Sequence, residues 1–528
     1  MRHVYGGPPE LAALIDDRGT SMGEEVALHS ESGELTYGEL RDKAARVARS
    51  LGELGIQPGD RVATMLEPAL HTFESWFGIA WAAGTEVPVN TDYKGEFLRH
   101  ILTNSGAKAM VVRDRWADRL AGLDLPSLEN VIVVGDTDGV DLDWPVTPFS
   151  EIVASDPTGR IERTPTDLAY ILFTSGTTGP SKGVMQSSRT IFQAAVNTAI
   201  HLMGVGPGDV AYSPFPMFHI VARNVIGATA FATGGKVAIR ETFSAGSWWD
   251  DVRSEGATWS IYMGALLHVL MAADEKPNDL DNPMTRLFGA APVEHLMEAF
   301  EKRFGLELIQ GYGSTELGIA TATEPGNRKA GTNGTALPHV EIAIHDENDD
   351  PCPPGVSGEI VARPAVASGI FSGYWEMPDA TINAFRNLWF HSGDRGYLTD
   401  EGDLIFVDRI KDSLRRRGEN ISSFEVEAAV GAHPNVAECA AYAVESDLAE
   451  DDVMVAVVLE STTGFDAAEL FAFCIETMPR FTVPRYIRVM DSLPKTPTHR
   501  VQKHLLRADG VTDETADRDA LGIVVPRS

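Results

Sequence analysis

Hydrophobic spacing near the N-terminus predicts a helix followed by several strands. Thr36, Tyr37, Gly38 and Glu39 form a capping-box pattern, which marks the start of a helix. Apolar residues then recur at helical spacing as far as Gly55, at Leu40, Ala44, Val47, Leu51 and Leu54. Short apolar runs follow at 61–63, 110–112, 131–134 and 169–173, with helical patterns between them. We therefore expect βαβ units and a largely parallel sheet.

The pattern changes twice further along the chain. After about residue 330, short strands such as 358–362 and 402–407 alternate with Gly and Pro turns. From about Asp408, an expected helix cap at Ser422, a strand at 453–459 and a helix at 465–478 indicate a small α+β unit. The stretch from Ala508 is polar and acidic, so we expect a loose tail there.

Together these patterns predict an α/β protein with two domains. The N-terminal domain, 1–410, would contain βαβ subdomains plus a β-rich subdomain, and the C-terminal domain, 411–507, would be small, mobile and α+β. Residues 508–528 would form the polar tail. A chain of 528 residues is too long for one hydrophobic core, which agrees with several subdomains around a cleft.

Composition narrows the function classes. The chain is 43% hydrophobic and 23% charged, which is typical of a globular protein. Its formal net charge of −32 argues against broad contact with nucleic acid or an anionic membrane, because both would repel it. Any binding of an anionic phosphate must then depend on local donors.

Several features favour a cytoplasmic location. Cys352, Cys439 and Cys474 lie far apart and form no disulfide framework, as expected in a reducing compartment. The N-terminus lacks the apolar core of a signal peptide. The uncharged stretch 190–208 is interrupted by polar residues, so it indicates a packed helix and no membrane span.

The strand at 169–173 ends in the loop Thr-Ser-Gly-Thr-Thr-Gly-Pro-Ser-Lys. The loop offers hydroxyls at Thr174, Ser175, Thr177 and Thr178, flexible backbone at Gly176 and Gly179, and a positive charge at Lys182. Backbone N–H groups, hydroxyls and one ammonium turned toward the same point form a phosphate cradle. The spacing is not that of a Walker A loop, so P-loop phosphoryl transfer is disfavoured. A flexible surface turn is the alternative interpretation.

Two further segments have the residue types of a nucleotide site. In 310–316, Gly311 and Gly313 allow close backbone approach, Tyr312 can stack on a base and Glu316 can hold magnesium. In 390–394, Asp394 is suited to ribose hydroxyls, with Arg409 in support. Taken singly, each segment could also be an ordinary turn.

In this order along the chain, the segments resemble the adenylate-forming superfamily. Its members are acyl-CoA ligases, adenylation domains of non-ribosomal peptide synthetases and firefly-type luciferases, and the chain is most similar to the acyl-CoA ligases. The resemblance runs from about residue 30 to residue 507 and includes the segments 214–219, 289–292, 408–412, 418–421 and 494–498.

The resemblance implies an enzyme that forms a CoA thioester in two half-reactions. In the first, a carboxylate attacks the α-phosphate of ATP, with magnesium present, and gives acyl-AMP and pyrophosphate. In the second, the thiol of coenzyme A attacks the acyl carbonyl and AMP leaves. The C-terminal domain would turn about Lys411 so that one cleft serves both steps.

The resemblance also implies a role for each matching residue. The loop 174–182 would hold phosphates, Thr315 would touch the α-phosphate and Glu316 the magnesium ion. Asp394 and Arg409 would bind the ribose, and His219 would lie beside the reacting carboxylate. The adenine would meet Gly289, Ala290, Ala291 and Tyr312. Gly418 would leave the pantetheine tunnel open, and 415–417, three arginines, would either meet CoA phosphates or form a solvated turn.

The chain departs from the family pattern near its C-terminus. The family usually has Gly-Lys after Pro-x-Thr-Pro-Thr, and this lysine bridges the carboxylate and the α-phosphate during adenylation. Here His499 and Arg500 occupy the two positions. Arginine is a longer, planar donor, so the exchange puts adenylation in doubt.

Four hypotheses remain open at this point. In the first, Arg500 or nearby Lys503 replaces the lysine and the chain is a complete acyl-CoA ligase. In the second, the enzyme only converts a supplied acyl-AMP, made by a separate adenylating ligase, into acyl-CoA. A carrier-protein-loading adenylation domain and a non-catalytic acyl-adenylate binder are the others. Small residues at 289–291, Gly318 and Ala320 favour a medium or bulky, mostly apolar acid, and an oligomer is compatible with the sequence.

Overall fold

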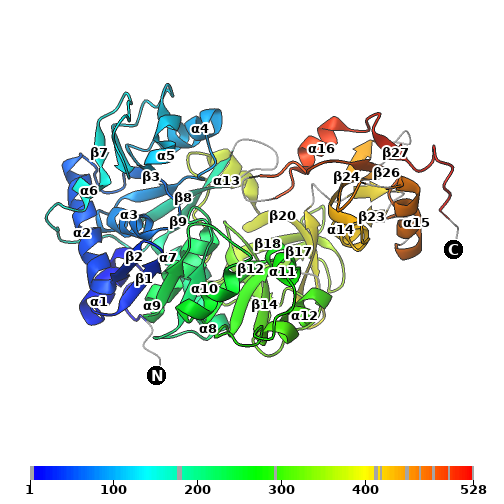
Figure 1. The fold of residues 1–528 in the computed structure, drawn as a ribbon, viewed down its shortest axis with the longest axis horizontal. Helices are drawn as coiled ribbons and strands as arrows, with labels where there is room; N and C mark the ends of the chain where they lie inside the picture. Colours follow the sequence, from blue (N-terminus) through cyan, green and yellow to red (C-terminus); the bar gives the residue numbers. More distant parts are fainter. Residues whose placement is uncertain are drawn as a thin grey trace.

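The computed structural model describes residues 5–174, 181–290, 294–409, 414–416, 419–421, 423–445, 451–462, 465–478, 482–496 and 500–525. Within these ranges the strands form five sheets. Figure 1 shows the C-terminal elements grouped at one end of the molecule, in orange and red, and the rest of the chain at the other. The protein is therefore an α/β protein with a large N-terminal and a small C-terminal part, as predicted.

The first large sheet has seven strands in the order β7-β6-β5-β3-β4-β8-β9. Adjacent strands of this sheet are parallel, except that β8 and β9 pair in the antiparallel direction. Its strands are β3 (Arg61–Met65), β4 (Thr85–Pro88), β5 (Ala109–Arg113), β6 (Asn130–Val134), β7 (Val146–Pro148), β8 (Leu168–Thr174) and β9 (Lys182–Ser187). The helices of this region are α2 (Tyr37–Glu53), α3 (Leu70–Trp81), α4 (Gly95–Ser105), α5 (Asp114–Ala117), α6 (Phe149–Ile152), α7 (Ser188–Ile191) and the 3-10 turn η1 (Asp118–Leu120).

The second large sheet has nine strands in the order β16-β15-β14-β13-β12-β10-β11-β1-β2. Its strands are β1 (Val26–Ser30), β2 (Gly33–Thr36), β10 (Val210–Ser213), β11 (Lys236–Ile239), β12 (Trp259–Met263), β13 (Arg286–Ala290), β14 (Glu307–Ser314), β15 (Gly318–Ala322) and β16 (Thr335–Ala336). The helices are α1 (Leu11–Ser21), α8 (Asn197–Met203), α9 (Thr229–Thr233), α10 (Trp248–Glu255), α11 (Gly264–Met271), α12 (Glu294–Phe304) and the π-helices η2 (Phe192–Val196) and η3 (Val221–Ala228).

A smaller, mostly antiparallel sheet follows. It contains β17 (Val340–His345), β18 (Gly358–Pro364), β19 (Phe385–Arg386), β20 (Trp389–Leu398) and β21 (Leu404–Arg409), with helix α13 (Pro378–Ala384) beside it. The C-terminal part contains β22 (Leu414–Arg416), β23 (Glu419–Ile421), α14 (Ser423–Gly431), β24 (Val436–Glu445), β25 (Asp451–Leu459), α15 (Ala467–Thr477), β26 (Tyr486–Val489), α16 (Lys503–Asp509) and β27 (Thr515–Asp517).

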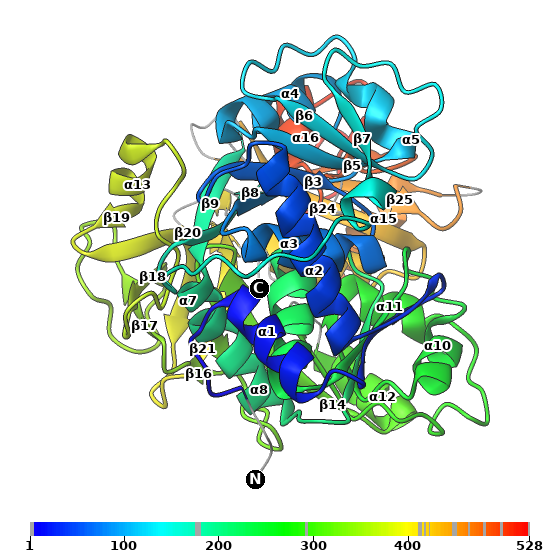
Figure 2. The ribbon, with the colours of Figure 1, turned by 90° about the vertical axis from the view of Figure 1, so that its left-hand side faces the viewer.

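Helix α3 joins the two large sheets. It contacts strands of both sheets as well as α1 and α2, and Figure 2 shows these helices between the sheets. Its buried face includes Phe73, Trp76 and Phe77, each at most 1% exposed. Burial of such large side chains contributes about 2 to 3 kcal/mol each. The core of the N-terminal part is therefore shared between the two sheets.

The structure confirms the elements with the clearest periodicity. Helix α2 begins at the predicted cap, where Glu39 N–H donates to Thr36 Oγ1 (3.2 Å) and Thr36 N–H donates to Glu39 Oε2 (2.9 Å). The uncharged stretch 190–208 is helical as far as Met203, with the π-helix η2 inside it, and most of the helical side chains are buried. Among the residues that the structure describes, no helix is long and apolar enough to cross a membrane.

The expectation of a loose tail from Ala508 is wrong for residues 515–517. These residues form β27, which pairs with β26 in an antiparallel ladder. Arg518 is 6% exposed and donates to the carbonyl oxygens of Val483 and Pro484. The strand was missed because the segment is polar and lacks an apolar pattern. Its polar groups are satisfied by partners on the neighbouring segment.

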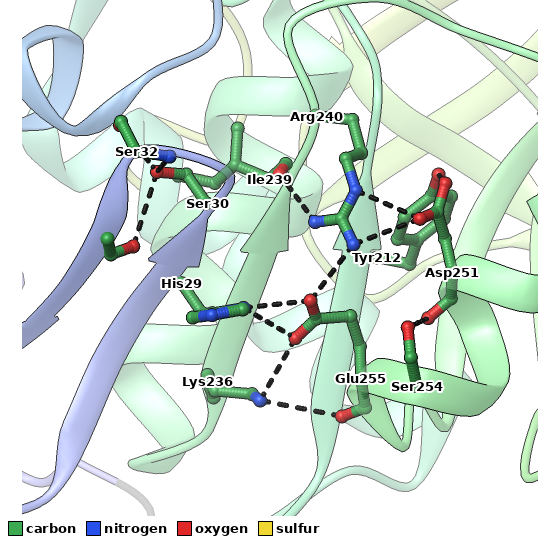
Figure 3. A network of polar contacts seen from close by, with 11 residues as sticks. His29, Ser30, Ser32, Tyr212, Lys236, Ile239, Arg240, Asp251, Ser254 and Glu255 are labelled. Carbon is green, nitrogen blue, oxygen red and sulfur yellow. Dashed lines mark hydrogen bonds and ion pairs between the residues drawn. The ribbon is translucent and has the colours of Figure 1, made fainter.

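A polar network holds helix α10 against the nine-stranded sheet (Figure 3). Glu255, in α10, accepts from Arg240 (3.0 Å), Lys236 (3.3 Å) and His29 Nδ1 (2.8 Å). Burial alone would raise the pKa of the Glu255 carboxyl, but the hydrogen bonds and charges of these three partners lower it below 4.5. The charged form is therefore favoured in the folded state, so the network stabilises the fold where Glu255 is ionised.

We expect Glu255→Gln to reduce the free energy of unfolding by about 2 kcal/mol at pH 7, because the three donors lose a charged acceptor. The contribution is complete above the ordinary carboxyl pKa and disappears as the pH falls through the lowered value. Urea unfolding at several pH values measures it. The exposed Glu53, paired with Arg49 at 2.6 Å, gives the control Glu53→Gln, with a change below about 0.5 kcal/mol. A difference that stayed constant from pH 7 to pH 3 would contradict the role of this charge.

Candidate active site

A cavity of about 840 Å³ lies where the N-terminal sheets meet Thr496 and Arg500 of the C-terminal part. This volume is typical of a site for a small molecule or nucleotide. Nine residues with a predicted site role line it, namely Thr174, Lys182, His219, Gly313, Thr315, Glu316, Asp394, Arg409 and Arg500. Segments that are separated by more than three hundred residues in the sequence therefore meet in one cavity.

The phosphate-loop prediction can be followed at its two ends. Thr174 ends β8 and Lys182 begins β9, and the two residues lie opposite each other in the antiparallel ladder. Both line the cavity. The residues between them with predicted phosphate contacts, Ser175, Gly176, Thr177, Thr178 and Gly179, fall outside the part of the chain that the structure describes.

Glu316 lies in a small polar cluster on the cavity wall. The Tyr374 hydroxyl donates to Glu316 Oε1 (3.0 Å), and the Lys182 ammonium lies over the Tyr374 ring, 4.8 Å from its centre. Gln186 Nε2 donates to the carbonyl oxygen of Thr315 (2.5 Å). A cation, a carboxylate and a hydroxyl are thus presented together beside the end of the predicted phosphate loop.

Asp394 lies on β20 opposite Arg409 on β21. Arg409 Nε is 3.3 Å from Asp394 Oδ1, and the Tyr312 hydroxyl donates to Asp394 Oδ2 (2.7 Å). Burial raises the pKa of Asp394, while Arg409 and Tyr312 oppose the shift. Within the described residues, buried Oδ1 accepts no hydrogen bond, so it is available to a hydroxyl donor such as that of a ribose.

His219 is partly buried, although its ring borders the cavity. Burial, and then the positive charge of Arg500, lower the pKa of His219 from 6.5 to about 4. The ring is therefore neutral at physiological pH. Its Nδ1 accepts the backbone N–H of Val221 (3.3 Å), which assigns the ring proton to Nε2. A neutral donor, and not a cation, borders the cavity at this point.

Arg500 lines the cavity together with Thr496, and both belong to the C-terminal part. Two hydrogen bonds join the two residues: Arg500 N–H donates to Thr496 Oγ1 (3.1 Å), and Thr496 N–H donates to the Arg500 carbonyl oxygen (2.7 Å). Although Arg500 is an exposed residue, desolvation by the atoms around its guanidinium and the charge of Arg409 lower the pKa of that group, and Asp394 and Glu316 act in the opposite direction. The guanidinium thus lies within the field of both predicted nucleotide-binding carboxylates.

Lys503 has a different environment. Its ammonium donates to Ser423 Oγ (2.6 Å) and contacts Glu427 Oε1 at 2.7 Å, both on α14. Its side chain is 14% exposed and does not line the cavity. Of the two cations that sequence analysis left open, Arg500 is the one that borders the cavity.

Several predicted residues do not line the cavity. Gly311 and Tyr312 lie on β14 and Gly289 and Ala290 on β13, behind its wall. Tyr312 is 7% exposed and supports Asp394, so its contact with an adenine base stays a prediction. Ala291, Lys411 and Gly418 are not among the described residues, and neither are the side chains of 415–417.

The small residues at positions 289 and 318 have a packing reason. A Cβ on Gly289 would lie 2.1 Å from the Tyr262 carbonyl oxygen, and one on Gly318 would lie 2.5 Å from that of Ala194. Neighbouring backbone therefore fills the space that sequence analysis assigned to the acyl group. These two glycines give no support to a bulky acid.

Two contributions to the site were missed at the sequence level. Tyr374 links Lys182 to Glu316, and the only sequence signal is an aromatic residue after Gly373. Arg223 lies four residues after His219, is 1% exposed and binds the carbonyl oxygen of Met217 (2.9 Å). An arginine in a mostly apolar segment, 221–228, is unusual enough to have been singled out.

Comparison with known proteins identifies the family. Residues 15–375 match the family model of AMP-binding enzymes, and residues 425–500 match that of the AMP-binding enzyme C-terminal domain. The chain belongs to the family of AMP-binding enzymes, which confirms the resemblance seen in its motifs.

The similar proteins include several acyl-CoA ligases. Crotonobetaine/carnitine–CoA ligase of Salmonella typhi is 29% identical over 520 residues, which cover 96% of this chain and all of that protein. The structure of ATP-bound MatB from Rhodopseudomonas palustris is 25% identical, with a TM-score of 0.85, and the match covers 95% of this chain and 99% of MatB. The anthranilate CoA ligase AuaEII with anthranoyl-AMP shares the fold, with a TM-score of 0.86 at 21% identity over 96% of this chain and 98% of AuaEII.

We expect His219 to remain neutral from pH 8 down to about pH 5, because burial and Arg500 hold its pKa at about 4. Nitrogen NMR of 15N-histidine-labelled protein measures this, and the signal is assigned by its loss in His219→Gln. Arg500→Ala should raise the pKa of His219, but burial should still keep it below 6.5. A His219 titration centred at or above 6.5 in the unchanged protein would contradict this electrostatic environment.

Proposed function

We propose that the chain is an acid–thiol ligase that joins a carboxylic acid to coenzyme A through an acyl-AMP intermediate. One observation carries the proposal: Arg500, from the C-terminal part, shares a cavity with His219, Glu316 and Asp394 of the N-terminal part. A single cavity thus offers groups suited to a carboxylate, a phosphate chain and a ribose. The acyl-CoA ligases among the similar proteins support this reaction class.

In the proposed first half-reaction, a substrate carboxylate oxygen attacks the α-phosphorus of ATP. A bond from carboxylate to phosphate forms, the bond to the β-phosphate breaks, and pyrophosphate leaves. Arg500 would neutralise the negative charge that the two anions bring together, and Lys182 the charge of the leaving pyrophosphate. His219, with its proton on Nε2, would donate to a carboxylate oxygen and fix its direction.

In the proposed second half-reaction, the sulfur of coenzyme A attacks the acyl carbonyl carbon. The thioester bond forms, the bond from carbonyl carbon to AMP oxygen breaks, and the thiol proton is released. Asp394 and Arg409 would retain the ribose of AMP through both steps. The family resemblance assigns to Lys411 a turn of the C-terminal domain between the steps, which would remove Arg500 from the cavity before the thiol enters.

Glu316 fits the role of a magnesium ligand. Within the described residues, no three His, Cys, Asp or Glu side chains are arranged as a metal cluster. Magnesium in nucleotide sites is commonly held by one or two carboxylates together with phosphate oxygens, and Glu316 borders the cavity beside Lys182. When bound there with ATP, magnesium would neutralise charge on the phosphate oxygens.

The reaction itself is the first test. Purified protein is incubated with ATP, magnesium, coenzyme A and one acid at a time, and acyl-CoA, AMP and pyrophosphate are quantified. The acids are those that the names of the similar proteins suggest, namely carnitine, crotonobetaine and anthranilate, together with straight-chain acids. We expect one thioester and one pyrophosphate per AMP with at least one acid. Thioester from acyl-AMP and CoA, with no pyrophosphate from ATP and any acid, would instead indicate thioester formation alone. Transfer only to a carrier protein, or no product from either mixture, would overturn the proposal.

Arg500→Ala should reduce pyrophosphate release about 100-fold, because a preorganised charge at the transition state is lost. The same variant should still convert supplied acyl-AMP and CoA into thioester. Lys503→Met is the control, since its ammonium is bound to Ser423 and Glu427 outside the cavity. It should change pyrophosphate release less than about tenfold. If Arg500→Lys instead released pyrophosphate much faster than the unchanged enzyme, Arg500 would be an impediment to adenylation and the complete-ligase proposal would fail.

A further inference from the structure

A buried ion pair joins the two large sheets directly behind the segment that carries His219. Arg223, in η3, contacts Glu86, in β4, and each residue is 1% exposed. Glu86 also accepts from Thr64 Oγ1 on β3 (2.7 Å). Burial of two opposite charges costs desolvation free energy, and replacing such a pair by apolar side chains is often neutral or stabilising. The pair at this place therefore requires an explanation beyond fold stability.

The guanidinium of Arg223 makes contacts in three directions. Its Nη1 binds Glu86, its Nε donates to the Met217 carbonyl oxygen (2.9 Å), and its face lies 4.9 Å from the centre of the Trp76 ring. The Tyr170 ring, on β8, is 5.7 Å away on another side. A planar fork that is stacked and bound at two edges has little freedom to move.

These contacts hold the backbone on both sides of His219. Met217 lies two residues before it, and the Arg223 N–H donates to the His219 carbonyl oxygen (3.3 Å). Phe218, His219 and Ile220 all line the cavity. Residues 88–90, which begin two positions after Glu86, line the same cavity. The ion pair therefore ties two walls of the cavity together.

We propose that Glu86 and Arg223 are positioning residues, which set the place of the His219 ring relative to the reacting carboxylate. The inference rests on the proposed function, because that function places the reacting carboxylate of the substrate beside His219. Neither residue lines the cavity, so both act through the segment 217–220. An apolar pair could fill the same space, but it could not bind the Met217 carbonyl and a strand of the other sheet at once.

The test compares Arg223→Lys with a matched control. Lysine keeps the charge but lacks the fork that reaches both Glu86 and Met217. Arg303 is a similar, mostly buried arginine that binds Asp279 (2.7 Å) and the carbonyl oxygen of Met271, and it does not line the cavity. Arg223→Lys should lower kcat/KM for the acid about 100-fold and leave the Kd of ATP nearly unchanged, whereas Arg303→Lys should change neither. Equal losses in both variants would overturn the inference.

A second variant separates positioning from stability. Glu86→Leu combined with Arg223→Met replaces the ion pair by apolar side chains, an exchange that is often neutral or stabilising. We expect it to unfold at a temperature no lower than Arg223→Lys does, yet to show the same loss of kcat/KM. Recovery of activity together with stability would mean that the pair only supports the fold, and the inference would be wrong.

The pKa of His219 can be measured without any enzymatic reaction, so it tests this inference separately from the proposed function. Loosening of the His219 segment admits water, so the pKa of His219 should rise from about 4 toward 6.5 in Arg223→Lys and stay unchanged in Arg303→Lys. Histidine NMR measures both values. If no acid gives a thioester, the proposed function fails, while the NMR comparison still decides whether the pair positions His219. An unchanged His219 titration in Arg223→Lys would overturn the positioning role.

Discussion

The buried contact between Glu86 and Arg223 is the constraint on which the geometry of the cavity depends. It fixes β4 of the seven-stranded sheet against the π-helix η3, which packs on β10 and β12 of the nine-stranded sheet. Packing alone allows small slips between sheets, whereas a stacked and doubly bound guanidinium has one favourable place. The wall that holds His219 and the wall formed by 88–90 therefore keep a fixed separation. Catalytic groups need this precision because misplacement by about 1 Å can cost a large part of the rate.

The same cavity resolves an apparent conflict of charge. A chain with a net charge of −32 repels nucleotides at long range, yet its site is proposed to bind ATP. Lys182, Arg409 and Arg500 border the cavity together. Surface charges beyond about 8 Å are screened at physiological salt, so the groups that line the cavity, and not the distant surface carboxylates, set the potential that a bound phosphate meets. Net charge thus argues against broad polyanionic partners without excluding a small anion in one enclosed place.

Local features of the fold followed from the sequence, and contacts between distant segments did not. The capping box at Thr36 and the strand before Thr174 depend on residues a few positions apart, so spacing alone predicted them. Asp394 and Arg409 lie opposite each other on adjacent strands, and the sequence motifs had assigned both residues to the same ribose site. By contrast, the contact of Glu86 with Arg223 spans 137 residues, and no periodicity encodes it.

Local structure distinguishes Arg500 from Lys503 as the cation at the cavity, which residue spacing alone does not do. Arg500 and Lys503 are three residues apart, and both are cations that could replace the usual lysine. Two hydrogen bonds to Thr496 hold the backbone of the arginine at the cavity. Helix α16 begins at Lys503, and the start of this helix directs the ammonium to Ser423 and Glu427 on α14. The Lys503 ammonium compensates the partly buried Glu427 carboxylate, whose side chain is 24% exposed. If the ammonium moved to the cavity, it would leave that charge unpaired, which favours its present place. Of Arg500 and Lys503, Arg500 is therefore the one that borders the cavity in this arrangement of the two parts of the chain.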